Sequence, residues 1–179
     1  MMAKTILDVS RWQGRIDWGK VKASGLVSGV MLKTVSTNSK FSNRKDGLYI
    51  DPTFEHNYAE CKRVGLPVGV YYYTYAVSHT SADAELALLK TALTGKTFEL
   101  PICVDVEDNK LRKLGKQALT NLTAYALATI ERWGFYALHY TGLNFGNTRL
   151  YMGGAALRKY DVWVAAYRDE KPTPAWSFG

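Results

Sequence analysis

The sequence predicts an α/β fold in which parallel strands alternate with covering helices, arranged as a (β/α) barrel. Three observations favour this fold class. Strand-like and helix-like segments alternate at least five times along the chain. Acidic residues stand at the carboxyl ends of strand-like segments, where barrels of this type have their active sites. No glycine-rich phosphate loop follows the first strand, which argues against the alternative, an open doubly wound sheet.

The composition is that of a globular domain and narrows the choice of partners. Of 179 residues, 47% are hydrophobic and 22% are charged, and we expect residues 1–179 to form a single domain. The net charge of +7 predicts attraction to polyanions such as nucleic acid or an anionic bacterial wall. Because there is no dense Lys/Arg run or nucleic-acid-binding motif, no nucleic-acid partner is expected. Twelve Tyr and five Trp suit a core and also a sugar-binding cleft.

Targeting signals and metal-binding spacings are not found in the sequence. The N-terminus has no apolar signal segment and no stretch approaches the length of a membrane span, so we expect synthesis in the cytoplasm and no membrane span. Cys61 and Cys103 have neither metal nor disulfide spacing and are expected to be buried thiols. The three histidines, His56, His79 and His139, show no ligand spacing, and we expect neither a metal nor a cofactor.

The first half of the chain is predicted to contain three strands and two helices. Residues 4–9 form a short apolar strand that carries Asp8. Asp17 caps the next helix, which ends at Gly25. The polar segment 36–50 is expected to be a long loop. The other predicted elements are a strand over residues 28–35 that ends near Lys33, a helix over 54–64 and a strand over 67–75.

The second half continues the alternation of strand and helix. A helix over residues 81–94 is rich in Ala and Leu and is expected to start at Ser81 or Asp83. A helix over residues 117–133 carries an apolar stripe along one face. The other predicted elements are strands over residues 100–107, 135–141 and 161–167, a short helical stretch over 144–158, and a turn-like tail from Arg168.

The strand over residues 100–107 carries the strongest candidate site. Because side chains alternate along a strand, Asp105 and Glu107 are expected to point the same way, roughly 6–7 Å apart. Like charges that close resist ionising together, so their pKa values are expected to differ. This pattern suits acid/base chemistry on a glycosidic bond. Two other interpretations are open: an acidic cap on the strand, followed by a solvated loop, or a Mg²⁺ site. Asp108 is expected to face away from Asp105 and Glu107.

Several motifs, in a fixed order, resemble one enzyme family. They are Asp-Val-Ser-x-x-Gln-Gly-x-Ile-Asp-Trp at 8–18, a strand ending in Lys33, Asp-Pro-x-Phe-x-x-Asn at 51–57, Pro-x-Gly-x-Tyr-Tyr at 67–72, and Asp-Val-Glu at 105–107. This order resembles the glycoside hydrolase family 25 lysozymes, the Chalaropsis-type muramidases of bacteriophage endolysins and bacterial autolysins. The resemblance covers nearly the whole chain.

The resemblance carries expectations about fold and activity. It implies an irregular TIM-like (β/α) barrel with five β/α units followed by extra strands. It also implies hydrolysis of the β-1,4 bond between N-acetylmuramic acid and N-acetylglucosamine in peptidoglycan. The expected partner is therefore a peptidoglycan glycan strand, and the expected place of action is the bacterial cell wall, after an endolysin-like release.

The resemblance also assigns roles to individual residues. Glu107 matches the catalytic acid, and Asp105 matches a neighbour that orients the substrate N-acetyl group or stabilises positive charge on the sugar. Asp8 matches a carboxylate on the first strand. Attack by a protein nucleophile and attack by the substrate's own acetamido group are both open. The expected substrate-binding residues are Lys33, Tyr49 and Tyr140, at loosely matching family positions, together with Tyr71, Tyr73 and Trp163, which are expected to line the cleft.

Two departures from the family pattern lead to rival hypotheses. Residues 71–73 are Tyr-Tyr-Tyr where members commonly have Tyr-His-Phe, which removes a group that titrates near neutrality. The family's last strands, with a Trp-Gln-Tyr segment and a further Asp, have no counterpart before Gly179. We therefore expect an incomplete barrel that self-associates through an exposed sheet edge. The rivals to a muramidase are a non-catalytic wall-binding remnant and a substrate-assisted glycosidase acting on chitin-like chains.

Overall fold

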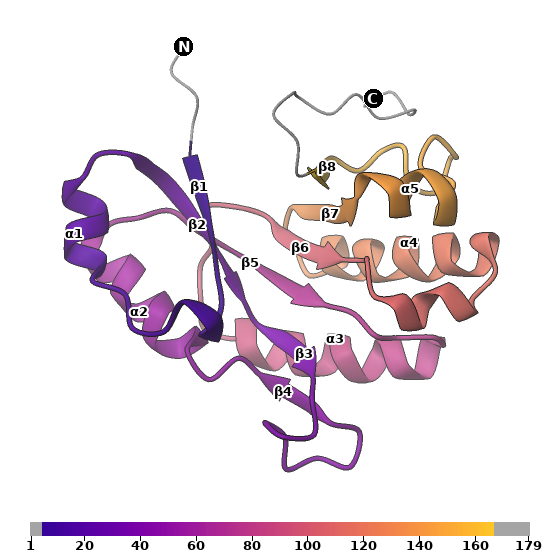
Figure 1. Cartoon of the computed structure of the whole chain (residues 1–179), viewed down its shortest axis with the longest axis horizontal. Coiled ribbons are helices and arrows are strands. Elements are labelled where there is room, and N and C mark those ends of the chain that lie inside the picture. Colours follow the sequence, from indigo (N-terminus) through magenta and orange to yellow (C-terminus); the bar gives the residue numbers. More distant parts are fainter. Residues whose placement is uncertain (1–4, 167–179) are drawn as a thin grey trace.

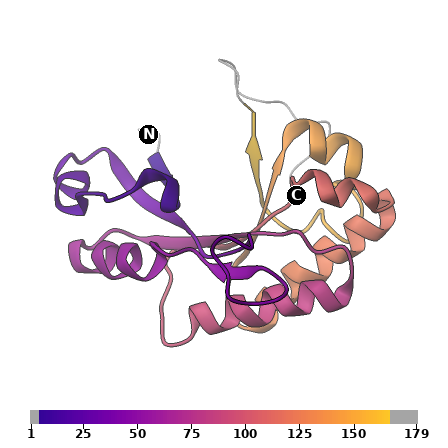
Figure 2. The same ribbon diagram turned by 60° about the horizontal axis from the view of Figure 1, so that its bottom comes forward.

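The computed structural model describes residues 5–166, which form one curled parallel sheet with helices on its convex side (Figure 1). The sheet has six strands in the order β1-β2-β5-β6-β7-β8, and every neighbouring pair is parallel. Figure 2 shows the β1 and β8 edges standing apart, with the concave face open between them. The strands are β1 (Thr5–Val9), β2 (Val27–Lys33), β5 (Val68–Tyr73), β6 (Ile102–Asp105), β7 (Ala137–Gly142) and β8 (Val162–Ala165).

The helices form the outer layer and bury the main core against the sheet. This core includes Val70, Leu89, Val104 and Leu127, all buried. Both cysteines are free and buried, as predicted. No helix among the described residues is long and apolar enough to cross a membrane. The helices are α1 (Trp18–Ala23), α2 (Phe54–Val64), α3 (His79–Leu93), α4 (Lys116–Arg132) and α5 (Leu143–Arg149), with 3-10 turns at Arg11–Gln13 and Asn109–Lys113.

Side-chain caps explain where two of these helices begin. The predicted cap of α1 is confirmed, because an Asp17 carboxylate oxygen accepts a hydrogen bond of 3.0 Å from the Lys20 amide. The predicted start of α3 at Ser81 or Asp83 is wrong. Ser78 is the N-cap, and it forms a reciprocal capping box with Ser81, so the helix begins two residues before Ser81.

The segment 36–50 is not a long loop, as the sequence analysis expected. Its two ends pair as an antiparallel ribbon of β3 (Val35–Thr37) and β4 (Leu48–Ile50), separate from the main sheet. Leu48 and Tyr49 are buried, so apolar burial draws the second strand against the domain. The polar connection between the strands contains an ion pair of 2.7 Å between Arg44 and Asp46. The two short strands were not predicted because the connection between them is polar.

Three predicted strands end earlier in the structure than the sequence suggested. Strand β5 ends at Tyr73 and not at Tyr75. Strand β6 ends at Asp105, although the Val106 amide still donates a hydrogen bond to the Tyr140 carbonyl. Glu107 therefore follows the strand and is not part of it. Strand β8 ends at Ala165, and the predicted tail from Arg168 lies outside the described residues.

His139 on β7 predicts an acid-sensitive core. The side chain is fully buried, neither ring nitrogen has a hydrogen-bond partner within residues 5–166, and burial lowers its pKa to about 3. The unfolded chain therefore binds one proton more than the folded chain between pH 6.5 and 3, so this contribution to stability is lost as pH falls below about 6.5. From pH 7 to pH 5, the wild type should lose about 2 kcal/mol more unfolding free energy than His139→Leu.

Urea denaturation at both pH values measures this difference. Comparison with the variant removes the opposing contribution of the buried carboxyl groups, which both proteins share. Equal losses in the two proteins would show that His139 is not the acid-sensitive group.

Candidate active site

The carboxyl ends of all six sheet strands meet around a cavity of about 200 Å³. Parallel pairing causes this, because parallel strands end at the same edge of a sheet. The cavity contains eight of the nine predicted site residues, although their roles stay predictions. The lining residues are Asp8, Lys33, Tyr71, Tyr73, Asp105, Glu107, Tyr140 and Trp163.

Strand register places four of these side chains in one row on the concave face. Tyr73 is the Cα partner of Asp105, Asp105 of Tyr140, and Tyr140 of Trp163. Partners in parallel strands project from the same face, so the row crosses β5, β6, β7 and β8 without interruption. The Tyr140 and Trp163 rings meet edge-to-face, with centroids 5.0 Å apart. The acid at the centre of this row is therefore flanked by aromatic side chains on both sides.

Asp105 is the most deeply buried acid of the cavity. Only 5% of the residue is exposed, and its Oδ1 atom has no hydrogen-bond partner among the described residues. Burial raises its pKa well above the ordinary value, and the negative charge of Glu107 adds to this, whereas Lys33 opposes it. The site therefore favours the protonated form of Asp105, which can donate a hydrogen bond.

Glu107 is half-buried and lies just beyond the end of β6. Burial raises its pKa, and the charges of Asp8 and Asp108 raise it further, whereas Lys33 lowers it. A Cβ atom at Gly142 would lie 4.0 Å from Glu107 Oε2, so this carboxyl group faces the carboxyl end of β7. Glu107 therefore shares the cavity with Asp105, as predicted, but it reaches the cavity from a connecting segment and not by alternation along a strand.

Asp8 and Lys33 supply charge at the rim. Partial desolvation raises the pKa of the exposed Asp8, while a hydrogen bond from the Tyr71 hydroxyl and the charge of Lys33 lower it. The Lys33 ammonium lies 5.0 Å from the Tyr73 ring centroid and 5.9 Å from that of Tyr71. Within the described part of the chain, Lys33 is the one cation that lines this cavity, and it counters the charge of three carboxyl groups.

Two residues lie differently from their predicted positions. Tyr49 is buried on β4, where its ring contacts Phe41 at 5.6 Å between centroids, and it is not among the residues that line the cavity. Asp108 also lies outside the lining, but it accepts a hydrogen bond of 3.2 Å from the Tyr73 hydroxyl. Asp108 also caps the 3-10 turn through the Lys110 amide. It is therefore linked to the cavity wall and does not simply face away.

A buried acid behind the site was missed by the sequence analysis. Glu85 on α3 accepts hydrogen bonds of 2.6 Å from the Thr74 hydroxyl and 2.8 Å from the Tyr75 amide. Burial raises its pKa to about 7. The Thr74 amide in turn donates to the Asp105 carbonyl. The sequence did contain a signal, because Glu85 lies within the apolar stripe of the helix that also contains Ala82, Leu86 and Leu89.

Residues 5–166 contain no group of three or more His, Cys, Asp or Glu side chains arranged to hold a metal ion.

Removal of the Glu85 carboxyl group should destabilise the fold. Glu85→Ala leaves the Thr74 hydroxyl and the Tyr75 amide without a buried acceptor, and should lower the free energy of unfolding by about 2–4 kcal/mol. Glu85→Gln keeps one acceptor oxygen and should cost less than half as much. Chemical denaturation at pH 7 measures the free energy of unfolding, which should be highest for wild type, lower for Glu85→Gln and lowest for Glu85→Ala. Equal stability of wild type and Glu85→Ala would contradict this role of Glu85.

Comparisons with known proteins agree with this geometry. Residues 7–178 match the family model for glycosyl hydrolases family 25. YegX of Escherichia coli O6:H1 is 30% identical over 176 residues, which are 96% of this chain and 60% of YegX. Lysozyme M1 of Streptomyces globisporus is 26% identical over 193 residues, covering 96% of this chain and 59% of the enzyme. The chain thus spans about 60% of the length of these relatives.

Solved structures share the fold. The autolysin LytC of Streptococcus pneumoniae has a TM-score of 0.77 at 27% identity, covering 97% of this chain and 40% of LytC. A bacterial lysozyme from Streptomyces coelicolor has a TM-score of 0.73 at 24% identity, covering 94% of this chain and 77% of the lysozyme. The predicted family and fold class are therefore confirmed, and the chain belongs to glycosyl hydrolase family 25.

Proposed function

We propose that residues 1–179 act as one muramidase domain that hydrolyses the β-1,4 bond between N-acetylmuramic acid and N-acetylglucosamine in peptidoglycan. The observation that carries this proposal is the cavity in which Glu107 and Asp105 lie beside each other with raised pKa values. Hydrolysis of a glycosidic bond needs an acid that still holds its proton near neutral pH. The proposed place of action is the bacterial cell wall.

Glu107 is the proposed general acid. Its carboxyl group is half-buried at the mouth of the cavity, where a leaving oxygen can reach it, and its raised pKa keeps the proton available. As the bond between the sugar carbon C1 and the leaving oxygen breaks, the Glu107 proton moves to that oxygen. The leaving sugar then departs with a free hydroxyl group. A water molecule later adds to C1 and returns a proton to Glu107.

Asp105 and Asp8 are the proposed partners of this acid. A protonated Asp105 can donate a hydrogen bond to the acetamido oxygen of the substrate, and an ionised one can accept from the acetamido N–H. Either contact would hold the acetamido group close to C1. Asp8, exposed at the rim and bonded by Tyr71, would place negative charge near the oxocarbenium-like transition state. The row of aromatic side chains offers faces on which sugar rings can pack.

The names of relatives support peptidoglycan as the substrate. One relative is called Lysozyme M1, and a LytC structure contains a synthetic peptidoglycan ligand. Both share the family with this chain, whose cavity contains the acid pair that a glycosidase requires.

The acid role of Glu107 can be tested directly. Glu107→Gln removes the transferable proton while keeping size and polarity, and should lower reducing-end release from purified peptidoglycan by a factor of roughly 10² or more. Glu55→Gln is the matched control, because its side chain is 65% exposed outside the cavity. Equal rates in Glu107→Gln and wild type would refute the acid role, and no release by either protein would refute the proposed activity.

The pH profile gives a second test. Glu107 acts in its protonated form, so activity should be lost as pH rises through its pKa. Lys33 lowers that pKa by its positive charge. Lys33→Met should therefore move the alkaline limb of the kcat/KM profile to higher pH, even if kcat also falls. Lys20→Met, at a side chain 86% exposed, should leave the limb unmoved. An alkaline limb that stays in place or moves to lower pH in Lys33→Met would contradict this electrostatic coupling.

A further inference from the structure

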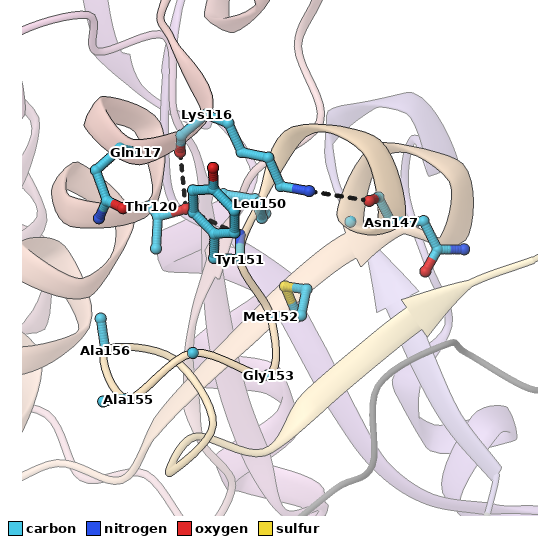
Figure 3. Close-up of a pocket in the computed structure, with 12 residues that line it drawn as sticks. Lys116, Gln117, Thr120, Asn147, Leu150, Tyr151, Met152, Gly153, Ala155 and Ala156 are labelled. Atoms are coloured by element: carbon cyan, nitrogen blue, oxygen red, sulfur yellow. Dashed lines mark hydrogen bonds between the residues drawn. The ribbon is translucent and has the colours of Figure 1, made fainter.

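A second and larger cavity lies away from the acids, on the helical side of the domain (Figure 3). Its volume is about 670 Å³, and it opens between the start of α4, the end of α5 and the connection that leads to β8. None of the described residues lines both this cavity and the one around Glu107. The lining residues are Lys116, Gln117, Thr120, Gly146, Asn147, Leu150, Tyr151, Met152, Gly153, Gly154, Ala155 and Ala156.

Hydrogen bonds fix the walls of this cavity to one another. The Tyr151 amide donates to Thr120 Oγ1 at 3.0 Å, and the Thr120 hydroxyl donates to the Lys116 carbonyl at 2.8 Å. Across the opening, the Lys116 ammonium donates to the Asn147 carbonyl at 3.3 Å. Figure 3 shows these contacts, which join α4 both to α5 and to the connection after α5. The cavity is therefore formed before any ligand binds, which reduces the entropy that binding costs.

The lining chemistry suits a neutral, N-acetylated sugar. Tyr151 is 48% exposed, and tyrosine offers an apolar ring face with a polar tip. The Lys116 ammonium lies 4.8 Å from the Tyr151 ring centroid. Two amide side chains, Gln117 and Asn147, provide donors and acceptors for hydroxyl and acetamido groups. Met152 and Ala155 add methyl-sized apolar surface for an acetyl group. A few polar groups set in a mainly apolar lining is the usual character of a small-molecule site of this volume.

Charge and position extend the argument to a glycan of the cell wall. Among the described residues that line this cavity, Lys116 has the one charged side chain, so an acidic substituent on a sugar would meet no repulsion from them. Helix α4 follows β6, and α5 follows β7, so the cavity is built on the two units that also carry Glu107 and Tyr140. The two cavities therefore draw on the same two strand–helix units of the domain.

We propose that this cavity is an accessory binding site for N-acetylated glycan strands, which holds the domain on the wall while the acid pair acts. That the polymer is peptidoglycan rests on the proposed function. The recognition of N-acetylated sugars can be tested independently of that function, because a chitin oligomer carries the same acetamido groups.

The chain offers two variants that should impair binding without disturbing the fold, one by filling the cavity and one by removing a ring from its lining. A Cβ atom at Gly153 meets no atom within 4 Å, and this glycine is not among those with positive φ. Gly153→Trp should therefore fill the cavity from its open side. Tyr151→Ala removes the exposed ring. Tyr136→Ala is the matched control, because Tyr136 is 60% exposed and lines neither cavity.

Binding is best measured in the Glu107→Gln background, in which the glycan is not consumed. Tetra-N-acetylchitotetraose should shift the amide NMR signals of Gly153 and Gly154. Retention on purified peptidoglycan should fall by about five- to tenfold in Tyr151→Ala and Gly153→Trp, which corresponds to one ring contact, and should not change in Tyr136→Ala. Unshifted glycine signals at saturating oligomer, or retention equal to that of the control, would overturn the proposal.

A parallel assay of reducing-end release separates this proposal from the catalytic one. If wild type releases reducing ends and the cavity variants keep full retention, the accessory site is refuted and the muramidase stands. If wild type releases none, but the cavity variants lose retention, the accessory site stands and the muramidase is refuted.

Discussion

The parallel pairing of six strands is the constraint on which the site depends. Parallel strands end at one edge, so side chains that are distant in sequence become neighbours wherever the strands stop. Register then fixes which of them meet, and a shift of one residue would turn the Asp105 carboxyl group from the concave face toward the helices. The convex core of aliphatic side chains holds that register in place. The chemistry of the cavity is therefore a consequence of packing on the opposite face.

Desolvation decides the charge state within this cavity. Burial raises the pKa of the Asp105 carboxyl group, and the positive charge of Lys33 opposes this shift. Burial is the larger effect, so the pKa of Asp105 stays well above its ordinary value. Glu107 is only half-buried. Its pKa is still raised, but its carboxyl group remains accessible to a substrate. Two acids two residues apart thus receive different environments because one ends the strand and the other follows it.

The sequence predicted the alternating fold, the family and most of the cavity because each has a local signal. Asp17 beside the start of an apolar helix and Asp105 at the end of an apolar strand are examples. Tertiary contacts that leave no such signal were missed. Tyr49 lies on a strand formed only by pairing across a polar connection, and Glu107 reaches the cavity beyond the end of β6. The second cavity depends on contacts between residues about 30 positions apart.

Glu85 connects the helical layer to the catalytic face. A buried acid normally costs stability, but two hydrogen-bond donors from the segment after β5 offset part of that cost. One of those donors, Thr74, also bonds the Asp105 carbonyl through its amide, and it directly follows Tyr73 of the cavity wall. The position of the wall is thus set by a polar contact made beneath the sheet as well as by strand pairing. A helix that only covered the sheet would need no acid at this position, so Glu85 is better explained by the segment that it holds than by the core around it.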